Sequence, residues 1–227
     1  MIPVVLASQS PSRRQILTAA GIDPLIIVSE VDERAIETAF TGSVGDLTTA
    51  LSEAKARAVI ERIRTCPPPT LSGCATVVVI AGDSLLEHEG RAIGKPATAE
   101  RTRAVWTEIA GRWTQLHTGH TVAVLTRTQD QDDSTRPGAL SLSAVRSRRS
   151  TTSVLIGSPS PEELAAYIAT EEPFHVAGAL TIDGYGGAFV DRLDGDHLTV
   201  LGLSLPVVRR LVTDMGLFWP DLWSPKG

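Results

Sequence analysis

The sequence predicts an α/β fold in a single domain, and three observations lead to this prediction. Residues 4–7 and 25–28 are short apolar runs bounded by turn residues, with a helical pattern between them, so a strand-helix-strand unit opens the chain. Residues 76–81 are β-branched almost throughout, which is typical of a buried strand. Residues 48–63 alternate apolar and charged side chains at helical spacing. A chain of 227 residues can form one domain or two small ones, and we favour one, spanning 1–227.

Further helical and extended patterns follow the strand at 76–81. The segment from about 127 to 150 interrupts them, because it is rich in Asp, Ser, Arg and Gln and too hydrophilic for a core. We therefore expect a long flexible loop inserted at the edge of the sheet. We interpret its basic end as solvated, with nucleic-acid binding there as the alternative. The remaining patterns predict helices over 98–110, 160–168 and 205–215, and strands over 114–126, 151–156, 188–193 and 198–200.

The composition excludes several classes of partner. Lys and Arg number 21 against 26 Asp and Glu, so the net charge of −5 offers no overall attraction for a nucleic-acid polymer. The apolar runs are far shorter than the roughly 20 residues that a membrane helix needs, so no membrane is expected. The first residues show no basic segment followed by an apolar one, and we expect a cytoplasmic protein. Cys66 and Cys74 flank three prolines without metal-ligand spacing and predict two unpaired thiols.

A strand that breaks into two serines, a proline and paired arginines predicts an anion site at the start of a helix. In the stretch LASQSPSRRQIL, residues 6–17, Ser10 can cap the helix and Pro11 suits its first position. Free backbone N–H groups there, with the guanidinium groups of Arg13 and Arg14 beside them, favour a phosphate. An ordinary capped helix with solvated arginines explains these residues equally well. From this stretch alone both interpretations stay open.

Two acidic positions and two lysines are the other candidates for chemistry. Asp83 follows the buried strand at 76–81, and Glu33 follows the second predicted strand, so both carboxylates are expected at one edge of the sheet. Two hard oxygen ligands beside a phosphate suit Mg²⁺ or Mn²⁺. Lys55 and Lys95 are candidate phosphate contacts, although a single lysine is more often a solvated side chain.

Seven segments follow one another along the chain: LASQSPSRRQIL, VDE at 31–33, LSEAKARAV at 51–59, VVIAGDS at 78–84, IGKP at 93–96, GRWTQLHTG at 111–119 and VLGLSLP at 200–206. In this order they resemble the Maf family of nucleoside triphosphate pyrophosphatases. The first stretch, the acidic position at 83 and the Gly-Lys-Pro turn are specific to the family, whereas the other segments are weak signals alone. The resemblance implies an elongated α/β fold, with a mixed sheet flanked by helices and a nucleotide cleft as in the Maf and inosine-triphosphate pyrophosphatases, and a homodimer.

The resemblance also implies a function and roles for individual residues. The family cleaves a nucleoside triphosphate between its α and β phosphates, commonly dTTP or UTP, with a divalent cation, and it is linked to inhibition of septum formation. Glu33 and Asp83 match the acidic pair that would hold the metal, and Asp83 would also position or deprotonate the attacking water. The positions that match the family's phosphate-binding and basic residues are Ser8, Ser10, Arg13, Arg14, Lys55 and Lys95.

The segment 175–184 departs from the family pattern. It reads HVAGALTIDG, with Val176 in place of a Lys and Asp183 in place of a Gln. Because the resemblance places Asp183 in the nucleotide site, it is expected to bind substrate. Three consequences stay open: Asp183 selects a different base, repels a phosphate, or joins the metal ligands. Two alternatives follow. One is a catalytically weak nucleotide-binding regulator that acts through a protein partner in cell division. The other is an inosine-triphosphate pyrophosphatase, against which the seven segments argue.

Overall fold

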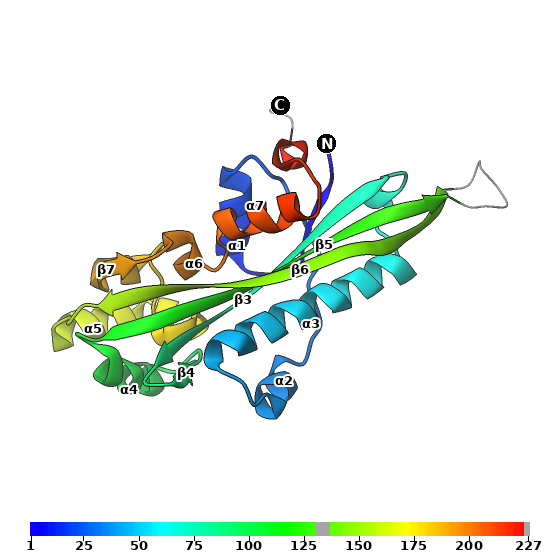
Figure 1. Cartoon of the computed structure of the whole chain (residues 1–227). Helices are drawn as coiled ribbons and strands as arrows, with labels where there is room; N and C mark the ends of the chain where they lie inside the picture. The colour runs from blue at the N-terminus through cyan, green and yellow to red at the C-terminus, as the bar shows by residue number, and fades with distance from the viewer. Residues whose placement is uncertain (130–136, 225–227) are drawn as a thin grey trace.

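The sheet is mixed, and its strand order is β2-β1-β3-β5-β6-β7, with β4 paired to β3 (Figure 1). The computed structural model describes residues 1–129 and 137–224. In these residues the strands are β1 Val4–Leu6, β2 Leu25–Ile26, β3 Thr76–His88, β4 Arg91–Ile93, β5 Trp113–Gln129, β6 Pro137–Ile156 and β7 Val190–Asp194. The helices are α1 Pro11–Ala19, α2 Glu33–Ala39, α3 Val44–Thr65, α4 Ala99–Ile109, α5 Pro161–Ala169, α6 His197–Leu201 and α7 Leu205–Asp214.

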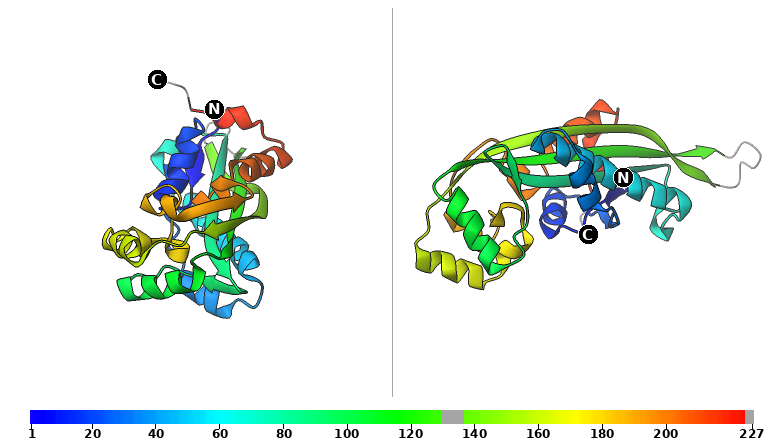
Figure 2. Two further views of the ribbon diagram at one scale, coloured as in Figure 1. Left: turned by 90° about the vertical axis from the view of Figure 1, so that its left-hand side faces the viewer. Right: turned by 90° about the horizontal axis from the view of Figure 1, so that it is seen from below.

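Long strands make the molecule elongated. β3, β5 and β6 pair in antiparallel fashion along nearly their whole length, whereas β1 pairs in parallel with β2 and β3. Helix α3 lies along one face of the sheet, α1 and α7 lie on the other, and α4 and α5 gather at one end (Figures 1 and 2). The predicted fold class, an α/β fold with a mixed sheet flanked by helices, is confirmed.

The core is divided by the sheet, because successive side chains of a strand point to opposite faces. On one face, Val78 and Ile80 pack in a cluster with residues of α1 and α7. On the other face, Val77 and Val79 pack with Val59 and other residues of α3. This alternation explains why residues 76–81 form a continuous apolar run, since both faces of the strand are covered.

A third apolar cluster lies where α4 and α5 meet the sheet. Trp106, Tyr167 and Phe189 pack there edge to face or tilted, with ring centroids 5.6–6.0 Å apart. The indole Nε1 of Trp106 donates to the carbonyl oxygen of Ala179 at 3.2 Å, so the buried ring has its polar atom satisfied. The cluster therefore anchors the glycine-rich segment after α5 to the rest of the molecule.

Two predictions about the second half of the chain are wrong. Residues 137–150 of the expected loop are the first part of β6, and the loop residues 130–136 lie outside the described part of the chain. The polar composition misled because this part of β6 pairs only with β5 among the described strands and exposes many side chains. Residues 198–200 belong to helix α6 rather than a strand, because the Asp196 carboxylate accepts the N–H of Leu198 at 3.0 Å and begins a helix.

Two further expectations concern the cysteines and a membrane-spanning helix. Cys66 and Cys74 both carry free thiols, which confirms the prediction of two unpaired cysteines. As for the membrane, none of the helices in the described ranges combines the length and the apolar character that a bilayer-spanning helix requires.

His120 predicts a loss of stability at mildly acidic pH. His120 lies on β5, and its ring is buried beside the start of α7. Its Nε2 accepts the N–H of Ser204 at 2.8 Å, and its Nδ1 donates to the carbonyl of Arg148 at 3.3 Å. Burial lowers the pKa of His120 to about 4. The unfolded chain binds this proton at higher pH than the folded chain does. Stability is therefore expected to fall by about 3 kcal/mol as the pH drops from about 6.5 to about 4.

Urea unfolding of the wild type and of His120→Gln at pH 7 and at pH 4.5 checks this expectation. The wild type is expected to lose more stability between the two pH values than the variant does, because the variant has no imidazole to protonate. An equal loss in both proteins would show that His120 is not the group responsible.

Candidate functional site

A gap in the strand pairing of β3 forms the centre of the candidate site. β1 pairs with Val78–Ile80 of β3 and β4 pairs with Leu86–His88, so residues 81–85 have β5 as their only described neighbouring strand. Asp83 and Ser84 lie in this gap. The prediction that Asp83 follows the end of its strand is wrong, because pairing with β5 continues as far as Glu87. The strand that does end beside the site is β1, at Leu6.

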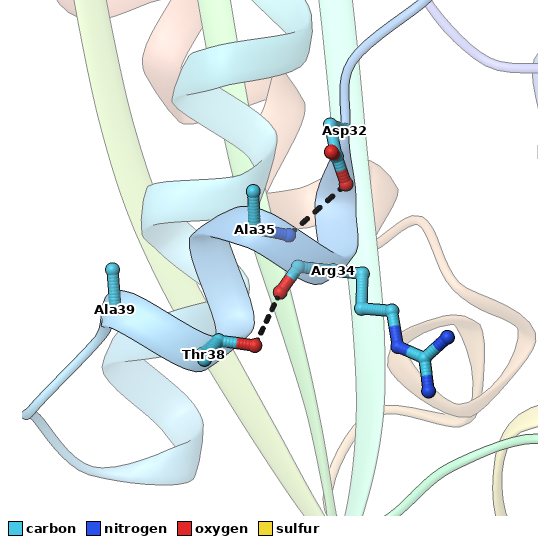
Figure 3. Close-up of a pocket in the computed structure, with 5 residues that line it drawn as sticks. All are labelled: Asp32, Arg34, Ala35, Thr38 and Ala39. Atoms are coloured by element: carbon cyan, nitrogen blue, oxygen red, sulfur yellow. Dashed lines mark hydrogen bonds between the residues drawn. The ribbon is translucent and has the colours of Figure 1, made fainter.

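Lys55 joins the two predicted acidic residues. It lies on α3 with its side chain only 8% exposed, and its ammonium group forms ion pairs with Asp83 Oδ1 and with Glu33 Oε1, the latter at 3.0 Å. Glu33 is the first residue of α2, whose start is fixed by the Asp32 carboxylate accepting the N–H of Ala35 at 3.0 Å (Figure 3). Glu33 and Asp83, which the sequence predicts at one edge of the sheet, are thus joined through the buried Lys55 ammonium group.

The hollow drawn in Figure 3 is a separate feature beside α2. It has a volume of about 410 Å³ and contains none of the predicted site residues. Asp32, the N-cap residue of α2, is one of the residues that line it. Its lining residues are Asp32, Arg34, Ala35, Thr38 and Ala39.

Glu37 is an acidic neighbour of the site that the sequence reasoning missed. It lies one turn after Glu33 on α2, on the same side of the helix. Partial burial raises the pKa of Glu37, and the negative charges of Asp83 and Glu33 raise it further, while Lys55 acts in the opposite direction. The spacing of four residues between two glutamates was the available signal. The charge of Glu37 therefore interacts with those of Asp83, Glu33 and Lys55, of which Lys55 forms ion pairs with the other two.

Arg13 reaches the same part of β3 from α1. Its Nε donates to the carbonyl of Gly202 at 2.8 Å, its Nη1 to Ser8 Oγ at 3.0 Å and its Nη2 to Ser84 Oγ at 3.1 Å. Burial lowers the pKa of Arg13, and the charges of Asp83 and Glu33 oppose that shift. Because all three donor nitrogens have partners, the guanidinium is held in one orientation.

Arg13 and Lys55 approach adjacent residues of β3 from opposite faces of the sheet. Arg13 bonds to Ser84 on the face of α1, and Lys55 bonds to Asp83 on the face of α3. Side chains on opposite faces of a sheet can contact one ligand only where no neighbouring strand lies between them. At Asp83 and Ser84, neither β1 nor β4 pairs with β3. The predicted phosphate-binding helix start and the predicted acidic pair are thereby brought together.

The other residues of the helix start lie around α1. Ser10 caps α1, with its Oγ accepting the N–H of Arg13 at 3.5 Å. Arg14 is exposed and lines, with Ser8 and Ser10, a groove of about 760 Å³. Asp183 lies against the first turn of the same helix, where its Oδ2 accepts a hydrogen bond from Ser12 Oγ at 2.9 Å.

Lys95 is the predicted site residue that the structure leaves apart. It is exposed in the loop after β4, and no contact found in the described ranges joins it to Asp83. β4 pairs Ile93 with Leu86, three residues beyond Asp83 on β3, so the loop carrying Lys95 runs beside the gap.

The donor set fits a divalent cation that arrives with a polyphosphate. Within residues 1–129 and 137–224, no three His, Cys, Asp or Glu side chains form a metal-binding group. Glu33 and Asp83 nevertheless converge on one point that a cation, the Lys55 ammonium, already occupies. Mg²⁺ is usually held by one or two carboxylates together with substrate phosphates rather than by protein ligands alone.

Comparison with known proteins places the chain in a family. Residues 3–215 match the family model described as Maf-like protein. A protein named nucleoside triphosphate pyrophosphatase from Nocardia farcinica is 45% identical over 97% of this chain and 96% of its own length. One of the same name from Streptomyces coelicolor is 43% identical over 98% and 95%. The solved Staphylococcus aureus Ham1 protein has a TM-score of 0.34 and 14% identity over 68% of this chain and 72% of its own. The sequence matches cover nearly the whole chain, and the protein is therefore a member of the Maf family.

Proposed function

We propose that this protein is a nucleoside triphosphate pyrophosphatase, which hydrolyses the bond between the α and β phosphates to give a nucleoside monophosphate and pyrophosphate. The observation that carries the proposal is the meeting of Arg13 with the Lys55–Asp83 pair at the gap in β3. The names of the relatives that match over the whole chain support it. We propose that it acts in the cytoplasm as a homodimer.

The phosphates are proposed to bind at the start of α1. The oriented guanidinium of Arg13 and the helix N-terminus favour an anion physically, and Ser8, Ser10 and Arg14 line the groove beside it. Lys95 is proposed to neutralise the outer phosphates from its loop beside the gap. Phosphoryl transfer depends mainly on positioning and on charge stabilisation, which cationic groups around the phosphates supply.

The attacking water is proposed to be positioned by Asp83, whose carboxylate accepts its proton as the oxygen attacks the α phosphorus. Lys55 holds that carboxylate in place, and we propose that its ammonium group faces the triphosphate in the loaded site. Glu33 and Asp83 would hold Mg²⁺ or Mn²⁺, which when bound supplies charge neutralisation at the phosphates. Lys55 keeps the two carboxylates together when they carry no metal.

We propose a pyrimidine nucleotide such as dTTP or UTP as the substrate, with Asp183 contributing to base selection. A carboxylate only accepts hydrogen bonds, so Asp183 favours a base edge that carries an N–H group, and the imide of uracil or thymine has one. The hydrogen bond from Ser12 holds the Asp183 carboxylate against the first turn of α1.

A second candidate is a nucleotide-binding regulator of septum formation with little turnover, acting through a protein partner. Val176 favours it, because an uncharged side chain stands where the family has a lysine. Asp183 also adds a negative charge where the family has a neutral side chain. Both differences reduce the attraction for a triphosphate at this part of the site.

The two candidates are separated by measuring pyrophosphate and monophosphate release from a panel of canonical and modified triphosphates, with Mg²⁺ and with Mn²⁺. The proposed function predicts turnover of at least one pyrimidine triphosphate, with one pyrophosphate released per monophosphate. Binding of nucleotides without any turnover would favour the regulator. Release of orthophosphate instead of pyrophosphate would overturn the proposed bond cleavage.

A further inference from the structure

An exposed aromatic ring stands on a tightly built turn near the candidate site. Tyr185 is 70% exposed, the most exposed aromatic side chain in the described part of the chain. It belongs to the sequence Gly184-Tyr185-Gly186-Gly187, so it carries the only side chain of that turn beyond hydrogen. A tyrosine side chain combines an apolar ring with a polar hydroxyl group, and such side chains are enriched at binding interfaces.

Glu172 holds the backbone of this turn. Its Oε2 accepts the N–H of Tyr185 and its Oε1 accepts the N–H of Gly186, each at 2.9 Å. Hydrogen bonds to a charged acceptor are about twice as strong as those between neutral groups. Both oxygens of one carboxylate therefore fix two successive peptide groups, which sets the direction in which Tyr185 leaves the backbone.

The glycines beside Tyr185 have their inner sides packed against the protein. A Cβ atom at Gly184 would contact the Glu172 carboxylate, and one at Gly186 would lie 2.5 Å from the hydroxyl oxygen of Tyr167. Tyr167 is itself buried in the cluster with Trp106. The turn is thus seated on a core and has no room to move inward, so the Tyr185 ring remains in solvent.

The segment that carries Tyr185 is joined to the proposed phosphate site. Asp183, two residues earlier, accepts the hydrogen bond from Ser12 in the first turn of α1, next to Arg13. Two residues of chain span at most about 7 Å between Cα atoms. A nucleotide with its phosphates at the start of α1 has its base several ångströms away, which is the region that the Tyr185 side chain can reach.

We propose that the Tyr185 ring is the platform on which the base of the nucleotide stacks, and that Glu172 is the positioning residue that presents it. This inference rests on the proposed function, because it takes a nucleoside triphosphate as the ligand. Every nucleobase has a π-face, so the contact supplies affinity with little base preference, whereas Asp183 reads the base edge.

The test compares Tyr185→Ala with Tyr185→Phe, using the triphosphate that the panel identifies. Tyr185→Ala is expected to raise KM, and the Kd for the nucleotide measured by calorimetry in EDTA, by about 5- to 100-fold, with a small change in kcat. Tyr185→Phe retains the ring and is expected to stay within about 2-fold of the wild type. Phe218→Ala removes another exposed ring, 67% exposed, and serves as the matched control without an expected effect.

A ligand without a base separates stacking from a general disturbance of the site. Inorganic tripolyphosphate is expected to inhibit the wild type and Tyr185→Ala with the same Ki. For Glu172→Ala we expect a weaker affinity for the nucleotide and an unchanged Ki for tripolyphosphate, with partial recovery in Glu172→Gln, whose amide oxygen still accepts one of the two N–H groups.

Three outcomes would overturn the inference. An unchanged KM and Kd in Tyr185→Ala, with turnover by the wild type, would reject stacking and leave the proposed function intact. Equal weakening of nucleotide and tripolyphosphate would show that Tyr185 supports the phosphate site instead. Failure of the wild type both to turn over and to bind any triphosphate would remove the ligand and reject both proposals together.

Discussion

Asp83→Asn is expected to lower kcat for the preferred triphosphate by roughly 100- to 10,000-fold, because the amide cannot accept a proton from the attacking water. The substitution keeps the size of the side chain and an oxygen that can face Lys55, so the fold is expected to survive. The measurement is pyrophosphate release under saturating nucleotide, with the unfolding transition of each protein followed in parallel.

The matched control is Glu87→Gln. Glu87 lies on the same face of β3, four residues from Asp83, and its carboxylate bonds to Nε2 of His117 at 3.1 Å rather than to Lys55. The substitution Glu87→Gln removes one negative charge from the same strand. It is expected to leave kcat within about 3-fold of the wild-type value, a small loss compared with that expected from removing a catalytic acid or base. A full kcat in Asp83→Asn, or an equal loss in both variants, would contradict the role given to Asp83.

Lys55→Met is expected to lower the free energy of unfolding by about 3–5 kcal/mol, because it leaves the Asp83 carboxylate buried without its cation. The two side chains are 8% and 9% exposed, so water screens their pairing poorly. Urea denaturation at neutral pH measures the effect. Lys95→Met is the control, since that exposed lysine is expected to change stability by no more than about 0.5 kcal/mol.

The double variant Lys55→Met with Asp83→Asn tests the physical cause. Neutralising Asp83 removes the unpaired charge, so the double variant is expected to be more stable than Lys55→Met alone. If the double variant is equally unstable or less stable, the loss comes from packing around α3 and not from the buried charge. Both variants are expected to lose activity. Urea denaturation does not require activity, so the comparison of stability is independent of catalysis.

The starts of α1, α4 and α5 could be predicted from the sequence because capping is a local interaction. Ser10 and Pro11 begin α1, Thr98 caps α4, and Ser160 forms a capping box with Glu163 at α5. Each cap involves residues within three positions of one another, so a short stretch of sequence contains the whole contact. The same holds for the apolar run at 76–81, whose composition already indicates a strand covered on both faces.

The ends of the long strands could not be predicted in this way. β3 continues past Asp83 because β5 pairs with it, and residues 137–150 are a strand because β5 pairs with them too. Gly119, the partner of Asp83, lies 36 residues away in the sequence, and the partners of 137–150 range from Gln129, 8 residues before Pro137, to Thr118, 32 residues before Ser150. Half of the residues in 137–150 are serine or arginine, and much of this strand remains exposed, so its composition resembles that of a loop.

The sequence by itself determined which chemical groups the site contains: the serines and arginines at the start of α1, the acidic residues and the lysines in their order along the chain. Only the tertiary structure decided that Lys55 binds both Glu33 and Asp83, that Arg13 binds Ser84, and that Lys95 stays apart. Those contacts depend on where β1 stops pairing with β3 and on how α1 and α3 pack on opposite faces. Such long-range geometry arises from the packing of the whole chain, which no local pattern of residues encodes.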